Sequence, residues 1–239
     1  MTTPNPEEID YKNPPFPLTA IDRQLLATKD SDYHRITWID LKQIIAKNTL
    51  EDLKRLPSDL KRYLAWSHNI KAQYGSITTF VIRERLRWTP EPSPSPSSTK
   101  PGTPSTTDSG PPLFAHHSPI PFADERDYAV LPNDWPYGFE PGITHLLVWT
   151  KTRIPVDEVR GDVTGESRQL VEEFVARFFV RDLRCKEDAD GDGADARERV
   201  QWFKNWVGLQ SVRGVDHVHV LVKDVPQGVL EKWAERRDL

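Results

Sequence analysis

Two histidines separated by one residue stand out in Asp216-His217-Val218-His219, inside the apolar run 215–222. In a β-strand, residues two apart point to the same face of the sheet, so the two imidazoles are expected to lie side by side. Such a pair can bind a phosphate, bind a metal, or act as nucleophile and proton donor. Two ordinary surface histidines on an edge strand would give the same pattern, so the pair alone does not decide between these alternatives.

A third histidine and several polar residues flank the strands that carry or neighbour this pair. His145 lies in the strongly strand-like run GITHLLVWTK (142–151). The other candidates for ligand contacts are Asp134 and Tyr137 in the turn NDWPYG, and Asn205, Gln210 and Ser211 ahead of the pair. Trp135 and Trp149 stand beside these residues, and either stack on a ligand or pack in the core.

The elements that must position these residues fall into two parts. Apolar residues recur at helical spacing over 17–88, with Thr37 as a helix cap, so this part is predicted to be a helical layer. The second part is predicted to contain strands at 127–134, 142–151, 200–207 and 215–222, a long amphipathic helix at 167–183, and a terminal helix at 226–237. Because few long crossovers separate the strands, this order favours an α+β fold with an antiparallel sheet.

Three segments lack the apolar residues that would make them fold. Residues 1–16 are predicted to be a disordered tail, and 89–119, rich in Pro, Ser and Thr, a disordered insertion. The acidic stretch 186–198 is predicted to be a second insertion. The rest of 17–239 is then one α+β domain. Several Ser-Pro and Thr-Pro pairs leave open that the first insertion is phosphorylated or binds a partner.

Composition narrows the class of protein. The chain has 239 residues, with 32 basic and 36 acidic residues and a net charge of −4, which gives no general argument for nucleic-acid binding. A single cysteine, Cys185, excludes an intramolecular disulfide framework. The sequence has no apolar run long enough for a membrane span and no secretory signal at its start. A cytoplasmic protein without a membrane partner is therefore expected.

Separate motifs in the second part resemble the histidine triad (HIT) superfamily. THLLVWTK resembles the superfamily's strand H-x-L-V-x-x-K, NDWP resembles its ribose-side turn, and FKNWVGLQSVRGVDHVHVLV resembles its N…GQSV-H-x-H-x-H-V ending. The resemblance covers roughly 127–223. It implies a HIT-like antiparallel sheet, and leaves a homodimer open beside the monomer.

The same resemblance implies residue roles. His217 would be the nucleophile, with His219 and His145 supporting it. Asn205, Gln210 and Ser211 would contact phosphate, and Asp134 a ribose. The chain departs from the pattern at Val215, which occupies the first triad position, and two extra residues precede the pair. This departure favours a non-catalytic scaffold.

A second resemblance extends into the helical part. The residues Trp38-Ile-Asp-Leu, Tyr63-Leu-Ala-Trp and Tyr74-Gly-Ser, followed by LPNDWPYG and HLLVWTK, are similar to a fungal family of N-acetylglucosamine-induced proteins. That resemblance implies a protein connected with the amino-sugar response. It implies no residue roles.

Two hypotheses for the function follow. The first is a phosphate site for a nucleotide or sugar nucleotide, in an enzyme that hydrolyses or transfers through a histidine nucleophile. The alternative is a non-catalytic ligand-binding or regulatory protein on a degenerate HIT-like scaffold. A metal-dependent hydrolase that uses His145, His217, His219 and Asp134 is a third reading, although we expect no resident metal and no cofactor because ligands at suitable spacing are missing.

Overall fold

The computed structural model describes residues 9–92, 112–157, 159, 161–187 and 194–235. At its centre is a four-stranded antiparallel sheet with the strand order β1-β2-β4-β3. The strands are β1 (Tyr128–Pro132), β2 (Ile143–Thr150), β3 (Val200–Phe203) and β4 (Asp216–Lys223). The predicted α+β class with an antiparallel sheet is therefore confirmed.

The two faces of the sheet carry different side chains. Val218, Val220 and Val222 of β4 belong to the largest core cluster on one face. His217 and His219 alternate with these valines and so point to the other face. In the register of the sheet, His217 pairs with Trp149 and His219 with Leu147. Because residues directly paired across antiparallel strands share a face, we call this side the histidine face.

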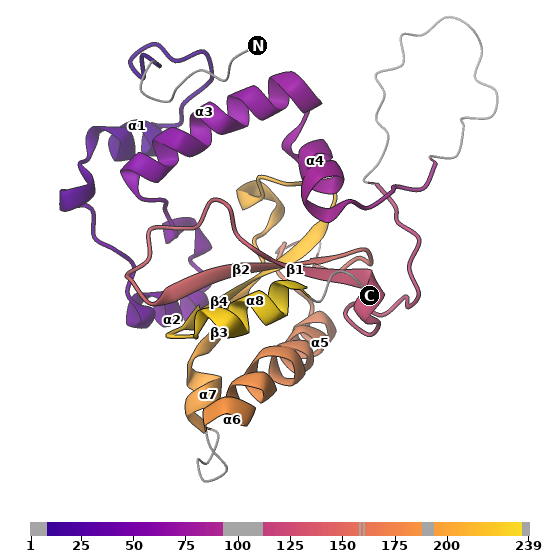
Figure 1. Cartoon of the computed structure of the whole chain (residues 1–239). Helices are drawn as coiled ribbons and strands as arrows, with labels where there is room; N and C mark the ends of the chain where they lie inside the picture. The colour runs from indigo at the N-terminus through magenta and orange to yellow at the C-terminus, as the bar shows by residue number, and fades with distance from the viewer. Residues whose placement is uncertain (1–8, 93–111, 158, 160, 188–193, 236–239) are drawn as a thin grey trace, which may run out of the picture.

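The valine face is covered by helices from the second half of the chain (Figure 1). These are α5 (Gly165–Val175), the π-helical turn η6 (Ala176–Val180), α6 (Arg181–Glu187), α7 (Ala194–Glu198) and α8 (Gln227–Glu235). The Thr164 hydroxyl accepts from the backbone N–H of Ser167 and so caps α5. Phe174 and Phe179, both fully buried, fill the space between this helix and the sheet.

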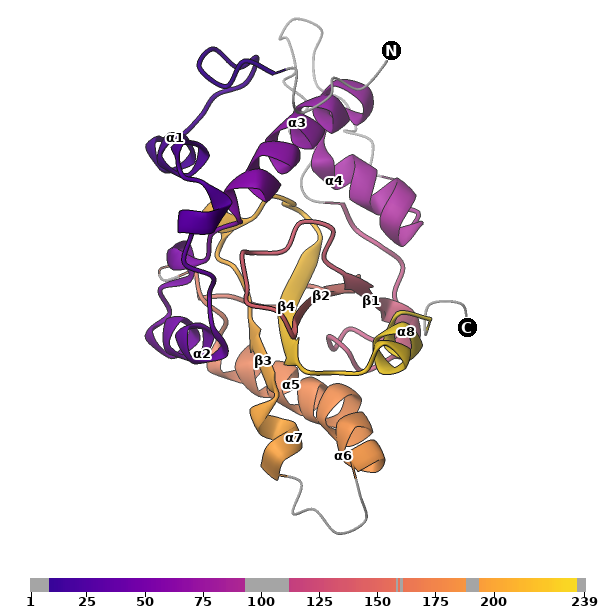
Figure 2. The ribbon, with the colours of Figure 1, turned by 60° about the vertical axis from the view of Figure 1, so that its left-hand side comes forward.

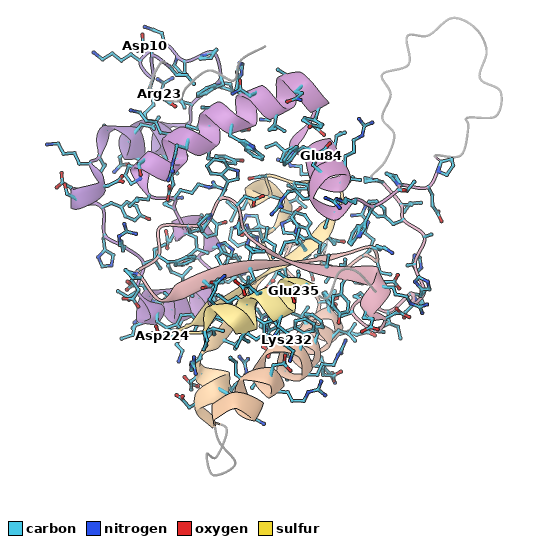
Figure 3. All side chains as sticks on the ribbon, in the orientation of Figure 1. Asp10, Arg23, Glu84, Asp224, Lys232 and Glu235 are labelled. Carbon is cyan, nitrogen blue, oxygen red and sulfur yellow. The ribbon has the colours of Figure 1, made fainter. Side chains whose placement is uncertain are left out.

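The histidine face is covered by the N-terminal helical layer, residues 20–86, whose helix Trp38–Lys47 lies beside the β3 edge of the sheet (Figures 1 and 2). Its helices are α1 (Ala20–Ala27), α2 (Trp38–Lys47), α3 (Pro57–Tyr74), α4 (Ile77–Phe80) and the π-helical turn η4 (Val81–Leu86). Short 3₁₀ turns lie at Asp30–Asp32, Leu50–Asp52, Glu125–Asp127 and Val207–Leu209. Side chains of the layer and of the sheet project into the space between them (Figure 3).

Local sequence explains where these helices begin and end. Thr37 forms the predicted cap of α2, in a reciprocal capping box with Asp40. Gly75 ends α3 with a φ of 79°, a conformation that favours glycine. α3 begins at Pro57, and the hydroxyl of the next residue, Ser58, donates to the carboxylate of Asp30.

The strands and helices of the second part follow the predicted order. The predicted strand 200–207 is too long, because β3 ends at Phe203. From there the chain turns so that Lys204 pairs with Asp216, with 3.0 Å between Nζ and Oδ1. The next residue, Asn205, contacts Nε2 of His219 through its side-chain amide, so both residues that follow β3 have partners on β4.

Each segment that was predicted to be disordered includes residues that are ordered in the structure. Phe114 lies inside the predicted insertion 89–119, yet it is buried and contacts the Trp88 ring at 5.3 Å between centroids. In the predicted tail 1–16, the Tyr11 hydroxyl donates to the carbonyl of Lys61. The predicted insertion 186–198 overlaps both α6 and α7. Residues 1–8, 93–111 and 188–193 lie outside the described residues.

No helix among the described residues has the length and hydropathy needed to cross a lipid bilayer.

Candidate functional site

A cavity of about 290 Å³ lies between the histidine face and the N-terminal helical layer. Both parts of the chain contribute to its wall, from Thr19 ahead of α1 to His219 in β4. Of the predicted site residues, the cavity is lined by His217, His219, Asp134, Tyr137, Asn205 and Ser211. His145 and Gln210 are not among its lining residues. They contact lining residues instead, His145 through His219 and Gln210 through Asn205.

His217 is anchored by one ring nitrogen. Its Nδ1 lies 3.0 Å from the carbonyl oxygen of Val215 and donates its proton to it. The Trp149 ring covers the imidazole at 4.3 Å between centroids. These contacts leave Nε2, which no described protein group hydrogen-bonds, as the nitrogen that can meet a ligand. Val215 stands where a triad histidine was expected, and its backbone carbonyl orients the imidazole.

His219 and His145 form a buried polar chain beside His217. The amide Nδ2 of Asn205 donates to Nε2 of His219 across 3.1 Å. His219 therefore carries its proton on Nδ1, which donates to Nε2 of His145 at 2.9 Å. The ring of Phe203 stacks on His219 at 4.6 Å, and that of Tyr137 on His145 at 5.4 Å. The chain of contacts fixes the positions of both rings.

All three imidazoles are neutral near pH 7. Burial lowers the pKa of His217 to about 4, against the raising effect of the bond to the Val215 carbonyl and with a smaller lowering contribution from the charge of Lys204. Burial, with the charge of Arg55, lowers the pKa of His145 to about 3. Burial also holds the pKa of His219 well below its ordinary value. A neutral His217 keeps a lone pair on Nε2, which is the form that acts as nucleophile or base.

These pKa shifts predict how stability depends on pH. The folded-state pKa of His217 is about 4, against an ordinary value of 6.5. The unfolded chain therefore binds the proton first as pH falls. The stability due to burying the neutral ring is complete above pH 6.5 and is lost as pH falls from 6.5 to about 4. Each such histidine should lower the unfolding free energy by about 1.4 kcal/mol per pH unit in that window.

Denaturant unfolding at pH 7, 6 and 5, with wild type and His217→Gln, measures this contribution. The unfolding free energy of the variant should depend on pH less steeply than that of wild type, by about 1.4 kcal/mol per pH unit between pH 6.5 and 4. Equal slopes in the two proteins would contradict burial of a neutral imidazole at this position. His116→Asn, at an exposed histidine, is the matched control and should keep the wild-type slope.

Arg55 is a cavity-lining residue that sequence reasoning missed. Its guanidinium carbon lies 3.9 Å from the centroid of the Tyr63 ring, and its Nε donates to the carbonyl of Trp135 at 3.3 Å. Nothing in the local sequence distinguishes Arg55 from other surface arginines. Its place depends on the packing of α3 and of the turn at 133–138 against the sheet.

The remaining predicted ligand residues lie in and near the cavity. Asp134 is held by Arg85 in a two-pronged ion pair, with N–O distances of 2.8 and 2.7 Å. The hydroxyl of Ser211 accepts from the Tyr63 hydroxyl at 2.9 Å. Gln210 donates to the carbonyl of Asn205 and so positions the loop rather than lining the cavity.

Three polar atoms of cavity-lining residues are buried and have no hydrogen-bond partner within the part of the chain that the structure describes. These are Nε1 of Trp135, Nε1 of Trp149 and Oδ1 of Asn205. A buried polar group without a partner costs about 1–3 kcal/mol. Three of the four such atoms among the described residues thus lie around one cavity, and the fourth, Nδ2 of Asn69, lies outside it.

Metal-ligand geometry occurs at a different place. Among the described residues, one group of His, Cys, Asp or Glu side chains is close enough to hold an ion: His117, Asp124 and Asp127. Oδ2 of Asp127 accepts from the backbone N–H groups of His117 and Ser118 at 2.7 and 2.8 Å, so this carboxylate already has a structural role. The four residues of the metal-dependent alternative do not form such a group.

The chain is similar to known proteins over most of its length. Residues 37–223 match a family model described as "Protein of unknown function (DUF3605)". The chain is 30% identical over 191 residues to N-acetylglucosamine-induced protein 1 of Candida albicans, covering 79% of this chain and 68% of that protein. It is 28% identical over 186 residues to Uncharacterized protein YPL067C of Saccharomyces cerevisiae, covering 77% of each.

One solved structure is similar over most of the chain. It is described as the crystal structure of HTC1, with a TM-score of 0.48 and 23% identity, and the match covers 83% of this chain and 93% of that one.

Proposed function

This chain belongs to the DUF3605 family, whose function is unknown, and we propose from its site that it binds a phosphate ester and transfers or hydrolyses it through His217. The observation that carries the proposal is the state of that imidazole. Nδ1 is tied to the carbonyl of Val215, the ring is neutral, and Nε2 is left without a protein partner at the wall of a cavity.

One arginine of the cavity wall suits a phosphate, although the wall as a whole carries three acidic and three basic residues: Asp22, Glu51, Asp134, Lys54, Arg55 and Arg85. Arg55 lines it and does not form any of the ion pairs found among the described residues. A guanidinium with free N–H groups recognises phosphate oxygens in pairs. The Arg55 side chain is held flat by the Tyr63 ring, which limits how much freedom it loses on binding.

The chemistry needs few groups. The Nε2 lone pair of His217 attacks phosphorus, the N–P bond forms, and the bond from phosphorus to the leaving oxygen breaks. The proton on Nδ1 stays hydrogen-bonded to the Val215 carbonyl, which stabilises the positive charge on the phosphorylated ring. A water or an acceptor hydroxyl then attacks phosphorus, the N–P bond breaks so that Nε2 recovers its lone pair, and the proton of the attacking group passes to an oxygen of the phosphate or to solvent. A leaving phosphate needs no proton, so a diphosphate bond is the favoured target.

Val215 favours a second candidate function, a non-catalytic ligand-binding protein on the same site. A carbonyl orients His217 without the further imidazole that the triad resemblance implies. In both versions the name of the Candida relative supports a link to the response to N-acetylglucosamine. A sugar nucleotide or an amino-sugar phosphate is therefore among the ligands to test.

A thermal-shift screen against nucleotides, sugar phosphates and sugar nucleotides tests binding. A true ligand at 100 times its dissociation constant should add about 2.7 kcal/mol to the unfolding free energy. Phosphorus NMR of the same mixtures reports turnover. Arg55→Gln should weaken any phosphate ligand by about 10- to 150-fold, the usual cost of a hydrogen bond to a charged group.

Arg83→Gln is the matched control, because that arginine is exposed and does not line the cavity. Ligand binding that is equal in both variants and in wild type would place the phosphate elsewhere and overturn the proposal.

A further inference from the structure

The valine face of β4 begins with a charged residue. Asp216 precedes Val218, Val220 and Val222 on this face, and those three valines belong to the apolar core. Oδ1 of Asp216 lies 3.0 Å from Nζ of Lys204, and the two side chains are 13% and 5% exposed. We call these two residues the valine-face pair. Apolar residues of similar size are often as stable in such a place, so stability alone does not explain the pair.

The carboxylate of Asp216 joins the ends of three strands. Its Oδ1 contacts Lys204, which follows β3, and its Oδ2 accepts the backbone N–H of Ile154 at 3.1 Å. Ile154 lies in the segment that leaves β2. Arg153 adds a second cation, with 3.6 Å between its Nη1 and Oδ2 of Asp216, and 43% of this arginine side chain is exposed. The first residue of β4 is thereby fixed to the segments that leave β2 and β3.

The residues next to the valine-face pair along the chain contact the histidines. Val215 directly precedes the aspartate, and its carbonyl oxygen accepts from Nδ1 of His217 at 3.0 Å. Asn205 directly follows the lysine, and its amide donates to Nε2 of His219 at 3.1 Å. The ion pair on the valine face therefore ties together the two backbone positions whose groups orient the imidazoles on the histidine face.

From these contacts we propose that the valine-face pair positions His217, because it holds the Val215 carbonyl where Nδ1 keeps its proton and Nε2 keeps its lone pair. Neither residue of the pair lines the cavity, so both act through their neighbours in the chain. The inference rests on the proposed function for the reaction that His217 performs. The position of the proton on its ring can be measured without any substrate.

The two charges of the pair act on His217 in opposite directions. Burial is the largest cause of the lowered pKa of His217, and among the charges Lys204 lowers this pKa while Asp216 raises it. A lysine or a carboxylate alone at this place would shift the pKa in one direction. As a pair they fix the backbone and leave the imidazole neutral, which is the form with a lone pair for attack on phosphorus.

Nitrogen NMR of the His217 imidazole near pH 7 tests the inference, because the ring nitrogens have different shifts in the two neutral tautomers. The resonances are assigned by their loss in His217→Gln. The double variant Lys204→Met with Asp216→Asn removes both charges and keeps an acceptor for the N–H of Ile154. Its ratio of the Nδ1–H tautomer to the Nε2–H tautomer should fall by about 2- to 12-fold, the worth of one hydrogen bond. Its melting temperature should fall by less than about 4 °C.

Two further variants complete the comparison. Arg153→Gln removes the exposed cation beside the same carboxylate, and as the matched control it should keep the wild-type tautomer ratio. Asp216→Glu keeps the charge but lengthens the side chain by a methylene, and it serves if the double variant does not fold. Its tautomer ratio should fall by about 2-fold or more. A folded double variant or a folded Asp216→Glu with the wild-type ratio would overturn the positioning role and leave the pair a structural one.

Phosphoramidate, a small phosphoryl donor, separates the inference from the proposed function. Nε2 of His217 should attack its phosphorus, the N–P bond of the reagent should break, and ammonia should leave. Phosphorus NMR should show a phosphohistidine in wild type that is absent in His217→Gln. It should form roughly 10-fold more slowly in the double variant, because the lone pair is aimed less accurately.

The combined results distinguish the two proposals. A tautomer ratio that responds to the valine-face pair, in a wild type that phosphoramidate does not phosphorylate, would overturn the proposed function and keep the positioning of the ring. Phosphorylation of His217 with a tautomer ratio that does not respond to the pair would overturn the inference and keep the proposed function.

Discussion

His217→Asn should lower turnover of a phosphate ester by a factor on the order of 10⁴ or more, while ligand binding survives. Asparagine keeps a polar side chain of similar size, but it has no ring nitrogen at the position of Nε2. The first step of the proposed reaction then has no nucleophile. Steady-state rates and dissociation constants for the two proteins, measured on the best ligand from the screen, give the comparison.

His116→Asn serves as its control, because His116 is exposed and lies outside the cavity. If the protein only binds its ligand, His217→Asn should instead weaken binding by about 1–3 kcal/mol, the cost of one hydrogen bond, and no turnover should be seen in wild type. Turnover that survives the substitution would refute a nucleophilic role for this histidine.

Phe174→Ala should lower the unfolding free energy by about 3–5 kcal/mol, the second largest effect that we expect. Phe174 is 0% exposed, and its ring stacks on Phe122 at 4.7 Å and meets Tyr128 at 5.0 Å. Removing the ring leaves a cavity between α5 and the valine face of the sheet. For a chain of this size the melting temperature should fall by roughly 6–20 °C.

Ile39→Ala is the control for removal of an exposed apolar side chain, because Ile39 is 68% exposed. That substitution should change the unfolding free energy by less than about 0.5 kcal/mol. A small effect of Phe174→Ala would mean that the helix collapses into the space, or that this face contributes less to the core than its burial indicates.

The placement of His217 and His219 on one face could be predicted because it depends on short-range geometry, whereas that of His145 was implied by the triad resemblance and depends on the register of β2 with β4. Period-two alternation in β2 and β4 is enough to put His217 and His219 on one face and the valines on the other. The order of strands and helices also followed from hydrophobic spacing. The length of β3 did not, because Lys204 and Asn205 leave the strand for partners that lie far away in sequence.

The parts that could not be predicted depend on contacts between distant segments. Phe114 stands in a proline-rich stretch that looks unfolded, and its burial depends on Trp88. Arg55 and Tyr63 reach the cavity only because the helical layer lies across the sheet. The periodicity of each helix can be read from a single sequence. Which face of the sheet the helical layer packs against cannot be read from it.

The position of β4 within the sheet has a consequence for how the protein is made. β4 is an inner strand, with β2 on one side and β3 on the other, and it follows nearly all other elements along the chain. During synthesis β1 and β2 are therefore made before β4, and one edge of β2 stays unpaired until β4 follows. Such an unpaired edge can pair with a wrong strand. The strand that closes this edge also carries His217 and His219. Completion of the sheet and assembly of the site are thus a single event, and a shortened chain that lacks β4 would have neither.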